Sequence, residues 1–342
     1  MVDMEKLYKD KIVLVTGGAG AIGTNLCDGL SRSGAKLVII LDDLSSGYMW
    51  NIPGRDNILF VKGCITDEVV LKRVFFEKPD YVFHLAAFFA NQNSVDYPEQ
   101  DLKINGQGTL KLLEYSLFSQ VKRFIYASSG CSIYGSSAPL PLTEDFMSMQ
   151  LSTPYQITKM LGELYCNFFF NHHGLDVVKP RFFNSYGPGE VPGQYRNVIP
   201  NFIYWAMKGD PLPITGSGEE TRDFTFVGDL VRGLLLSGLQ ESASGQEFNL
   251  ASAKETRIID LADMINASVK NESGVKFIDK RKWDTKSRLL ASVDKANKLI
   301  GYEPSIDFEE GLARTIAWFK DNWDYIEASN SFTPGMSSAT RK

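Results

Sequence analysis

Tyr155 and Lys159 are four residues apart, a spacing that places both side chains on one face of an α-helix. Ser152 or Thr153 can cap the start of that helix, and Pro154 suits its first position. An ammonium group next to a phenol lowers the pKa of the phenol. The pair therefore predicts that Tyr155 exchanges a proton with a substrate near neutral pH, with Lys159 as its charged partner.

A glycine-rich turn follows the apolar run at residues 11–16 and contains Gly17, Gly20 and Gly23. Glycines allow a tight turn and let backbone N–H groups approach a pyrophosphate at the start of the next helix. Asp42 ends the second apolar run, where a carboxylate can accept hydrogen bonds from both ribose hydroxyls and repels a 2′-phosphate. These residues predict a dinucleotide site that takes NAD rather than NADP.

Short apolar runs alternate with amphipathic segments along the first half of the chain. We expect strands at residues 11–16, 36–41, 59–61, 81–84 and 123–127, with helices at 25–31, 67–76 and 107–116. Later in the chain we expect a strand at 247–250 and helices at 229–239, 257–268 and 308–321. The alternation predicts an α/β fold with a doubly wound parallel sheet of the Rossmann type.

The pattern becomes less regular after Arg181, which predicts a smaller, mixed C-terminal lobe that binds the substrate. We expect an NAD-binding domain at residues 1–180 with a returning segment at about 222–252. The substrate lobe then comprises residues 181–221 and 253–326. Residues 327–342 are rich in Ser, Thr, Asn and Gly, and we expect a disordered tail there.

The overall composition excludes several classes of partner. A net charge of -5 gives no general attraction to nucleic acid or to anionic lipid. No apolar run is long enough to span a membrane, and residues 1–10 lack the apolar core of a signal peptide. The four cysteines are scattered without metal-ligand spacing, so we expect reduced thiols, no bound metal and a cytoplasmic location.

Seven motifs together resemble those of the extended short-chain dehydrogenase/reductase family, and within it the nucleotide-sugar epimerases and dehydratases. They are TGGAGAIG at 16–23, LDDLSSG at 41–47, HLAA at 84–87, YASSGCSIYG at 126–135, PYQITK at 154–159, RFFNSYGPG at 181–189 and RDFTFVGD at 222–229.

The resemblance implies which residues contact NAD and which contact the nucleotide sugar, most commonly a UDP-sugar. The implied NAD contacts are Gly17, Gly20, Ala21, Ile22, Gly23, Asp42, Asp43, Ser46, Cys64, Ile65, Leu85, Ala86, Ala87, Tyr155 and Lys159. The implied substrate contacts are Asn184, Arg222, Arg281 and Arg288. Relatives commonly form homodimers through two helices, which here correspond to segments near residues 106–119 and 155–172.

Two positions depart from the family pattern. Cys64 stands where the family usually has an Asp that contacts adenine, so one adenine contact is weakened. Gly130 stands four residues before Tyr134, where the family normally carries its catalytic Ser or Thr. We expect a neighbouring hydroxyl to take that role, Ser129 first and Ser132 second, because a glycine lets the loop shift by one residue.

The absence of carboxylates at positions 131 and 132 reduces the number of reactions that the resemblance implies. A 4,6-dehydratase of the family typically has an Asp-Glu pair at the positions of Cys131 and Ser132, and a decarboxylase usually has Glu at the second of them. NAD, Tyr155, Lys159 and a hydroxyl suffice for reversible oxidation at C4. The expected activity is a 4-epimerase, in which a transient ketone rotates and takes the hydride back on its other face. The alternatives are a C4 dehydrogenase or reductase, a 4,6-dehydratase, and a catalytically idle NAD-binding protein.

Overall fold

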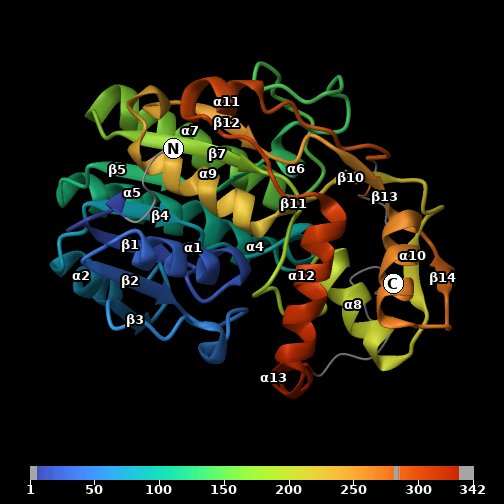
Figure 1. Ribbon diagram of the computed structural model, residues 1–342. Coiled ribbons are helices and arrows are strands. Elements are labelled where there is room, and N and C mark those ends of the chain that lie inside the picture. Colours follow the sequence, from blue (N-terminus) through green and yellow to red (C-terminus); the bar gives the residue numbers. More distant parts are fainter. Residues whose placement is uncertain (1–5, 281–283, 285, 331–342) are drawn as a thin grey trace.

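A computed structural model of the chain describes residues 6–280, 284 and 286–330. Its centre is an eight-stranded sheet in which every pairing is parallel (Figure 1). The order is β12-β7-β5-β4-β1-β2-β3, and β6 pairs with β7. These strands are β1 (Ile12–Thr16), β2 (Leu37–Asp42), β3 (Ile58–Lys62), β4 (Tyr81–His84), β5 (Arg123–Tyr126), β6 (Ser128–Ser129), β7 (Val177–Phe182) and β12 (Glu247–Leu250). The doubly wound parallel sheet predicted from the sequence is confirmed.

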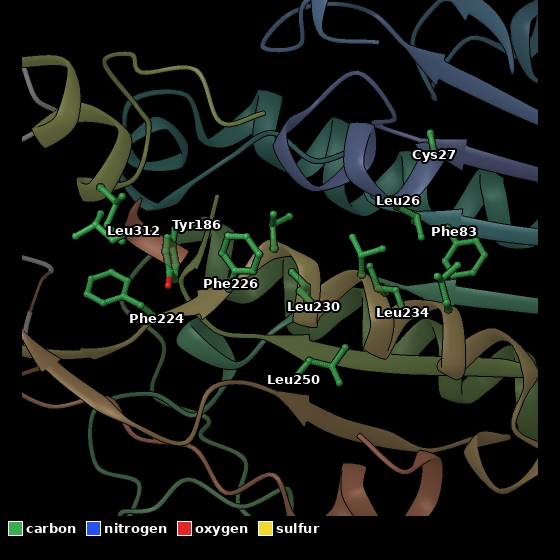
Figure 2. Close-up of a cluster of buried hydrophobic side chains, with 14 of the residues drawn as sticks. Leu26, Cys27, Phe83, Tyr186, Phe224, Phe226, Leu230, Leu234, Leu250 and Leu312 are labelled. Atoms are coloured by element: carbon green, nitrogen blue, oxygen red, sulfur yellow. The ribbon is translucent and has the colours of Figure 1, made fainter. Parts of the chain in front are cut away.

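Helices cover both faces of the sheet because successive side chains of each strand point to opposite faces. The main ones are α1 (Ala21–Arg32), α2 (Glu68–Phe76), α5 (Thr109–Phe118), α7 (Pro154–His173) and α9 (Val227–Leu239). Along β1, Val13 and Val15 pack in one core with α1 and α9, and Figure 2 shows part of this core. Leu14 packs in a second core with α2, α5 and α7.

The chain order of the strands changes direction at β1, with β2 and β3 on one side and β4 and β5 on the other. Parallel sheets bind ligands at the carboxyl ends of the strands beside such a switch point. Gly17, Asp42 and Leu85 directly follow or end β1, β2 and β4, so the fold brings them to one edge of the sheet.

A second region, on the right in Figure 1, lies beyond the carboxyl ends of the strands. Its strands are β8 (Ser185–Tyr186), β9 (Leu212–Thr215), β10 (Thr221–Asp223), β11 (Thr225–Phe226), β13 (Glu255–Arg257) and β14 (Val275–Ile278), which form three two-stranded sheets. Its helices are α8 (Val198–Lys208), α10 (Ile258–Val269), α12 (Phe308–Asp321) and α13 (Trp323–Ser329).

The remaining helical segments are short. They are η2 (Met49–Asn51), α3 (Asn91–Asp96), α4 (Pro98–Asp101), η3 (Leu102–Gly108), α6 (Gly130–Ile133), η4 (Glu241–Ala243) and α11 (Asp294–Ile300). No helix in the described part of the chain is both long enough and apolar enough to cross a membrane.

Most strands and helices expected from the sequence lie within a few residues of their predicted bounds, and the helix at 308–321 has the bounds predicted for it. The expected start of the disordered tail at Glu327 is wrong, because α13 continues to Ser329. Ile326 is fully buried, and Glu327 forms an ion pair with Lys208 at 2.5 Å. The rest of the expected tail, residues 331–342, lies outside the described residues.

Candidate active site

The glycine turn between β1 and α1 packs its backbone against the backbone of other segments and of its own helix. Gly17 has φ +71°, and a Cβ there would lie 2.7 Å from the backbone nitrogen of Ala86. A Cβ on Gly23 would lie 2.1 Å from the carbonyl oxygen of Gly17. Helix α1 starts at Ala21 with no side chain capping it, which leaves its first N–H groups directed at the cavity in front of them. The turn has the shape and the donors that a pyrophosphate requires.

Asp42, at the end of β2, is fixed beside this turn. One carboxylate oxygen accepts a hydrogen bond from the backbone N–H of Ala19 at 3.0 Å, and the other accepts one from Leu44 at 2.8 Å. Burial raises the pKa of the carboxyl, and the two backbone donors act against that shift. The neighbouring Asp43 is exposed, and its carboxylate accepts a hydrogen bond from the N–H of Ser45 at 2.8 Å.

A cavity of about 330 Å³ opens along this edge of the sheet. Its wall includes every residue that the sequence assigned to NAD: Gly17, Gly20, Ala21, Ile22, Gly23, Asp42, Asp43, Ser46, Cys64, Ile65, Leu85, Ala86, Ala87, Tyr155 and Lys159. Two features of this wall fit a dinucleotide: the glycine turn and the carboxylate of Asp42 at the end of β2. Cys64 lies in the wall with its sulfur 3.2 Å from the hydroxyl of Thr66, and it offers no carboxylate there.

Tyr155 and Lys159 are brought to this cavity by helix α7. Thr153 caps the helix by accepting a hydrogen bond from the N–H of Gln156, and Pro154 is its first residue. Of the two possible caps left open by the sequence, Thr153 is therefore the one used. Both site residues are buried, with 6% of Tyr155 and 4% of Lys159 exposed.

Burial opposes the effect that the sequence predicts for Lys159 on the pKa of Tyr155. The lysine Nζ donates a hydrogen bond to the carbonyl of Ala127 at 2.9 Å and lies 5.7 Å from the centre of the tyrosine ring. Burial raises the pKa of the phenol, and the carboxylate of Asp101 adds to the rise. Burial also lowers the pKa of Lys159 to about 8, and Asp101 opposes that fall. Exclusion of water outweighs the neighbouring charge, a balance that the spacing of the two residues does not reveal.

Asp101 belongs to a buried polar network that the sequence analysis missed. Its carboxylate accepts hydrogen bonds from the hydroxyl of Thr158 at 2.7 Å and from the side-chain amide of Asn105 at 2.8 Å. Asn105 lies in the π-helical segment η3, and its side-chain oxygen accepts from the N–H of Phe88 at 2.8 Å. The network fixes a negative charge behind Lys159.

The two candidate serines lie side by side. The hydroxyl of Ser129 donates to that of Ser132 at 2.9 Å, and both residues are in the wall of the cofactor cavity. Ser132 is 1% exposed, so Ser129 is the more accessible of the two. A Cβ on Gly130 would lie only 2.0 Å from the ring of Phe183. The phenylalanine therefore occupies the space that a side chain at the family's usual position would need.

A second cavity of about 250 Å³ adjoins the first, and the two share wall residues that include Asn91, Cys131, Asn184 and Arg196. Asn184 and Arg222, which the resemblance implies as substrate contacts, both line it. Arg288 is not brought to the site: it pairs with Glu255 at 2.5 Å, is half exposed and lines neither cavity. Arg281 lies outside the described residues.

Residues 187–197, called the strap here, close one side of the cofactor cavity. The side chains of Asn25 and Asn51 each donate to a strap carbonyl at 2.8 Å. Arg196, near the end of the strap, donates to the carbonyl of Ser46 in the loop after β2. Arg196 comes from more than a hundred residues further along the chain than Asp42, so the local sequence around Asp42 does not reveal this cation.

Comparison with known proteins shows to which family this chain belongs. The model of the NAD dependent epimerase/dehydratase family matches residues 13–251. The chain belongs to this family, which confirms the resemblance read from its motifs; it is an NAD-dependent enzyme, and NAD is its cofactor.

Individual relatives match nearly the whole chain. A UDP-glucose 4-epimerase of Mycolicibacterium smegmatis is 34% identical over 90% of this chain and 98% of its own length. The structure of an epimerase from Methanothermobacter thermautotrophicus is 56% identical, with a TM-score of 0.95 over 96% of this chain and 98% of its own. The structure of a UDP-glucose 4-epimerase from Thermotoga maritima, solved with UDP-glucose, is 35% identical, with a TM-score of 0.86 over 91% and 99%.

Proposed function

We propose that this enzyme is a nucleotide-sugar 4-epimerase whose substrate is a UDP-sugar. The observation that carries the proposal is the meeting of the two cavities. Tyr155 and Ser129 line the cofactor cavity, and Cys131 and Asn184 line both cavities. A sugar that extends from the second cavity toward the first would meet a phenol, a hydroxyl and the cofactor at one place.

The second cavity suits the nucleotide part of the substrate. It combines apolar and aromatic side chains such as Phe202 and Trp205 with polar groups that include Asn184 and Arg222. A guanidinium group matches the oxygens of a diphosphate, and a side-chain amide can donate to them. Arg222 and Asn184 are therefore assigned to the diphosphate, with the sugar lying between them and Tyr155.

The residues of the chain then supply proton transfer and orientation. Tyr155 removes the proton of the C4 hydroxyl, and Ser129 donates a hydrogen bond to the C4 oxygen. Lys159 holds positive charge near Tyr155, which acts as the phenolate and becomes the neutral phenol when it takes the C4 proton. NAD, held by the glycine turn and Asp42, would supply reversible hydride transfer at C4. The same phenol then returns the proton, so the reaction has no net oxidation.

The turn that contains Cys131 and Ser132 favours epimerisation over the other reactions known for the family. A dehydratase or decarboxylase of the family usually carries carboxylates at these positions, and this chain has a thiol and a hydroxyl. The side chain of Ser132 is uncharged, and its oxygen accepts a hydrogen bond from the hydroxyl of Ser129. The arrangement supplies one acid-base group, Tyr155, which suffices for C4 oxidation and reduction.

Incubation with a panel of nucleotide sugars tests the proposal, with products identified by NMR and NADH followed by absorbance. We expect a C4 epimer and no net NADH. Tyr155→Phe should lower turnover by several orders of magnitude with little change in NAD binding, whereas the half-exposed Tyr325→Phe should leave turnover unchanged. Stoichiometric NADH would instead identify a dehydrogenase, and loss of water or CO₂ from the sugar would identify a dehydratase or decarboxylase.

A further inference from the structure

Lys286 places an ammonium group in the wall of the substrate cavity. Its Nζ donates a hydrogen bond to the carbonyl oxygen of Cys131 at 2.6 Å. Cys131 is the second residue of helix α6, which begins directly after Ser129, and it lines both cavities. The ammonium is therefore held by a residue that lines both the substrate cavity and the cofactor cavity.

The charge of Lys286 is not balanced by a carboxylate. Within the described part of the chain it forms no ion pair, and the nearby Asp284 is paired with Arg222 at 3.2 Å. Glu220, the other carboxylate in the cavity wall, is paired with Lys280 at 3.1 Å.

Burial and the positive charge of Arg222 both disfavour the charged form of this lysine. Together they lower its pKa to about 8, with burial as the larger cause, although Cys131 and Asp284 act in the opposite direction. Holding a desolvated cation next to a second cation costs free energy. An anion that binds against the ammonium recovers that cost, so the cavity is prepared for a negative group at this point.

Two anions of a nucleotide sugar could meet Lys286, the diphosphate and a carboxylate on the sugar ring. The diphosphate is attached to C1, across the pyranose ring from C4. A C6 carboxylate is attached to C5, the direct neighbour of C4. The proposed function places the C4 oxygen at Ser129, and the Lys286 ammonium is held by the backbone two residues further along. The neighbouring Arg222 is already assigned to the diphosphate, and the contact of Lys286 with Cys131, which lines both cavities, places the ammonium toward the cofactor side. These two observations favour the carboxylate.

The geometry points to Lys286 as the residue that recognises a carboxylate on the sugar, so that the substrate is a nucleotide-linked hexuronic acid. This inference rests on the proposed function for the direction in which the sugar lies. It adds a substrate class: the enzyme selects an acidic sugar over the corresponding neutral hexose.

Calorimetry on the NAD-loaded protein tests the inference with three probes, UDP, UDP-glucose and UDP-glucuronate. The wild type should bind UDP-glucuronate more tightly than UDP-glucose. Lys286→Met should weaken UDP-glucuronate by about 10- to 100-fold, the typical effect of a hydrogen bond between charged groups, and leave UDP and UDP-glucose nearly unchanged. Lys286→Arg should retain most of the preference, and Lys254→Met, which removes a lysine that pairs with Asp307 and lines neither cavity, should change none of the three affinities.

The pH dependence gives a second measurement that a merely structural role would not change. The preference of the wild type for UDP-glucuronate should decline as the pH rises through about 8 and the amine loses its proton. Lys286→Arg should keep its preference over the same range because a guanidinium stays charged.

Two results would overturn the inference. One is an equal loss of affinity for UDP and UDP-glucuronate in Lys286→Met, which would assign the lysine to the diphosphate. The other is a wild type that binds UDP-glucose as tightly as UDP-glucuronate. Binding does not require turnover, so a failure to detect C4 inversion would contradict the proposed function and leave this test unaffected.

Discussion

Replacing Ser129 by alanine removes the accessible hydroxyl of the serine pair and should slow the reaction at C4. A lost hydrogen bond to the developing charge in the transition state costs about 10²–10³-fold in turnover. Ser132 is buried and contacts Ser129 at 2.9 Å, so Ser132→Ala removes only a hydrogen bond that orients its neighbour. A neutral hydrogen bond contributes about 0.5–1.5 kcal/mol, and the matched variant should therefore lose only about 2- to 12-fold.

The assay is the initial rate of C4 inversion at saturating nucleotide sugar, measured by NMR, with the bound NAD of each variant determined after denaturation. Equal NAD content would show that the loss of rate is not a loss of cofactor. A crippled Ser132→Ala beside a nearly normal Ser129→Ala would refute the assignment. The double variant Ser129→Ala/Gly130→Ser should not recover activity, because the new Cβ would meet the ring of Phe183 at 2.0 Å. Recovery would show that this ring moves aside.

Three further changes test other parts of the site. Asp42→Ala should weaken NAD and relax its discrimination against NADP, and calorimetry that finds the wild type binding NADP at least as tightly would contradict this reasoning. Asp101→Asn removes a carboxylate that favours protonated Lys159. Since activity requires the ammonium, the alkaline limb of the pH–rate profile should move to lower pH, and an unchanged limb would remove Asp101 from the mechanism. Leu164 and Phe168 on α7 are about half exposed. We expect them to lie in a homodimer interface, so aspartate at both positions should convert a dimer to a monomer in light scattering, and a monomeric wild type would exclude the dimer.

The parts of the site that depend on short stretches of sequence could be predicted. The glycine turn, Asp42 and the Tyr155–Lys159 pair each lie where one strand or helix begins or ends, and their positions follow from the local pattern. The alternation of apolar runs and amphipathic segments is also a local pattern, and it predicts the parallel sheet. The residues assigned to NAD line one cavity because all of them lie at one edge of that sheet.

The parts that depend on distant contacts could not be predicted. Arg288 has the residue type of a phosphate ligand, yet it pairs with Glu255 on β13, thirty-three positions away, and lines neither cavity. Lys286 and Arg196 reach the cavities only through the packing of segments far apart in the chain. The pKa of Tyr155 depends on how completely water is excluded, and the spacing of a motif carries no information about that.

The hydrogen bonds of the strap join segments that are far apart in the chain. Asn25 lies on α1 and Asn51 lies in η2, and each donates to a strap carbonyl, while Arg196 of the strap donates to the carbonyl of Ser46. Glu190, Arg196 and Asn197 of the strap lie in the wall of the cofactor cavity, so one side of that cavity is built by residues from the second half of the chain. We expect the half of the chain that carries the glycine turn to retain NAD poorly when these contacts are removed.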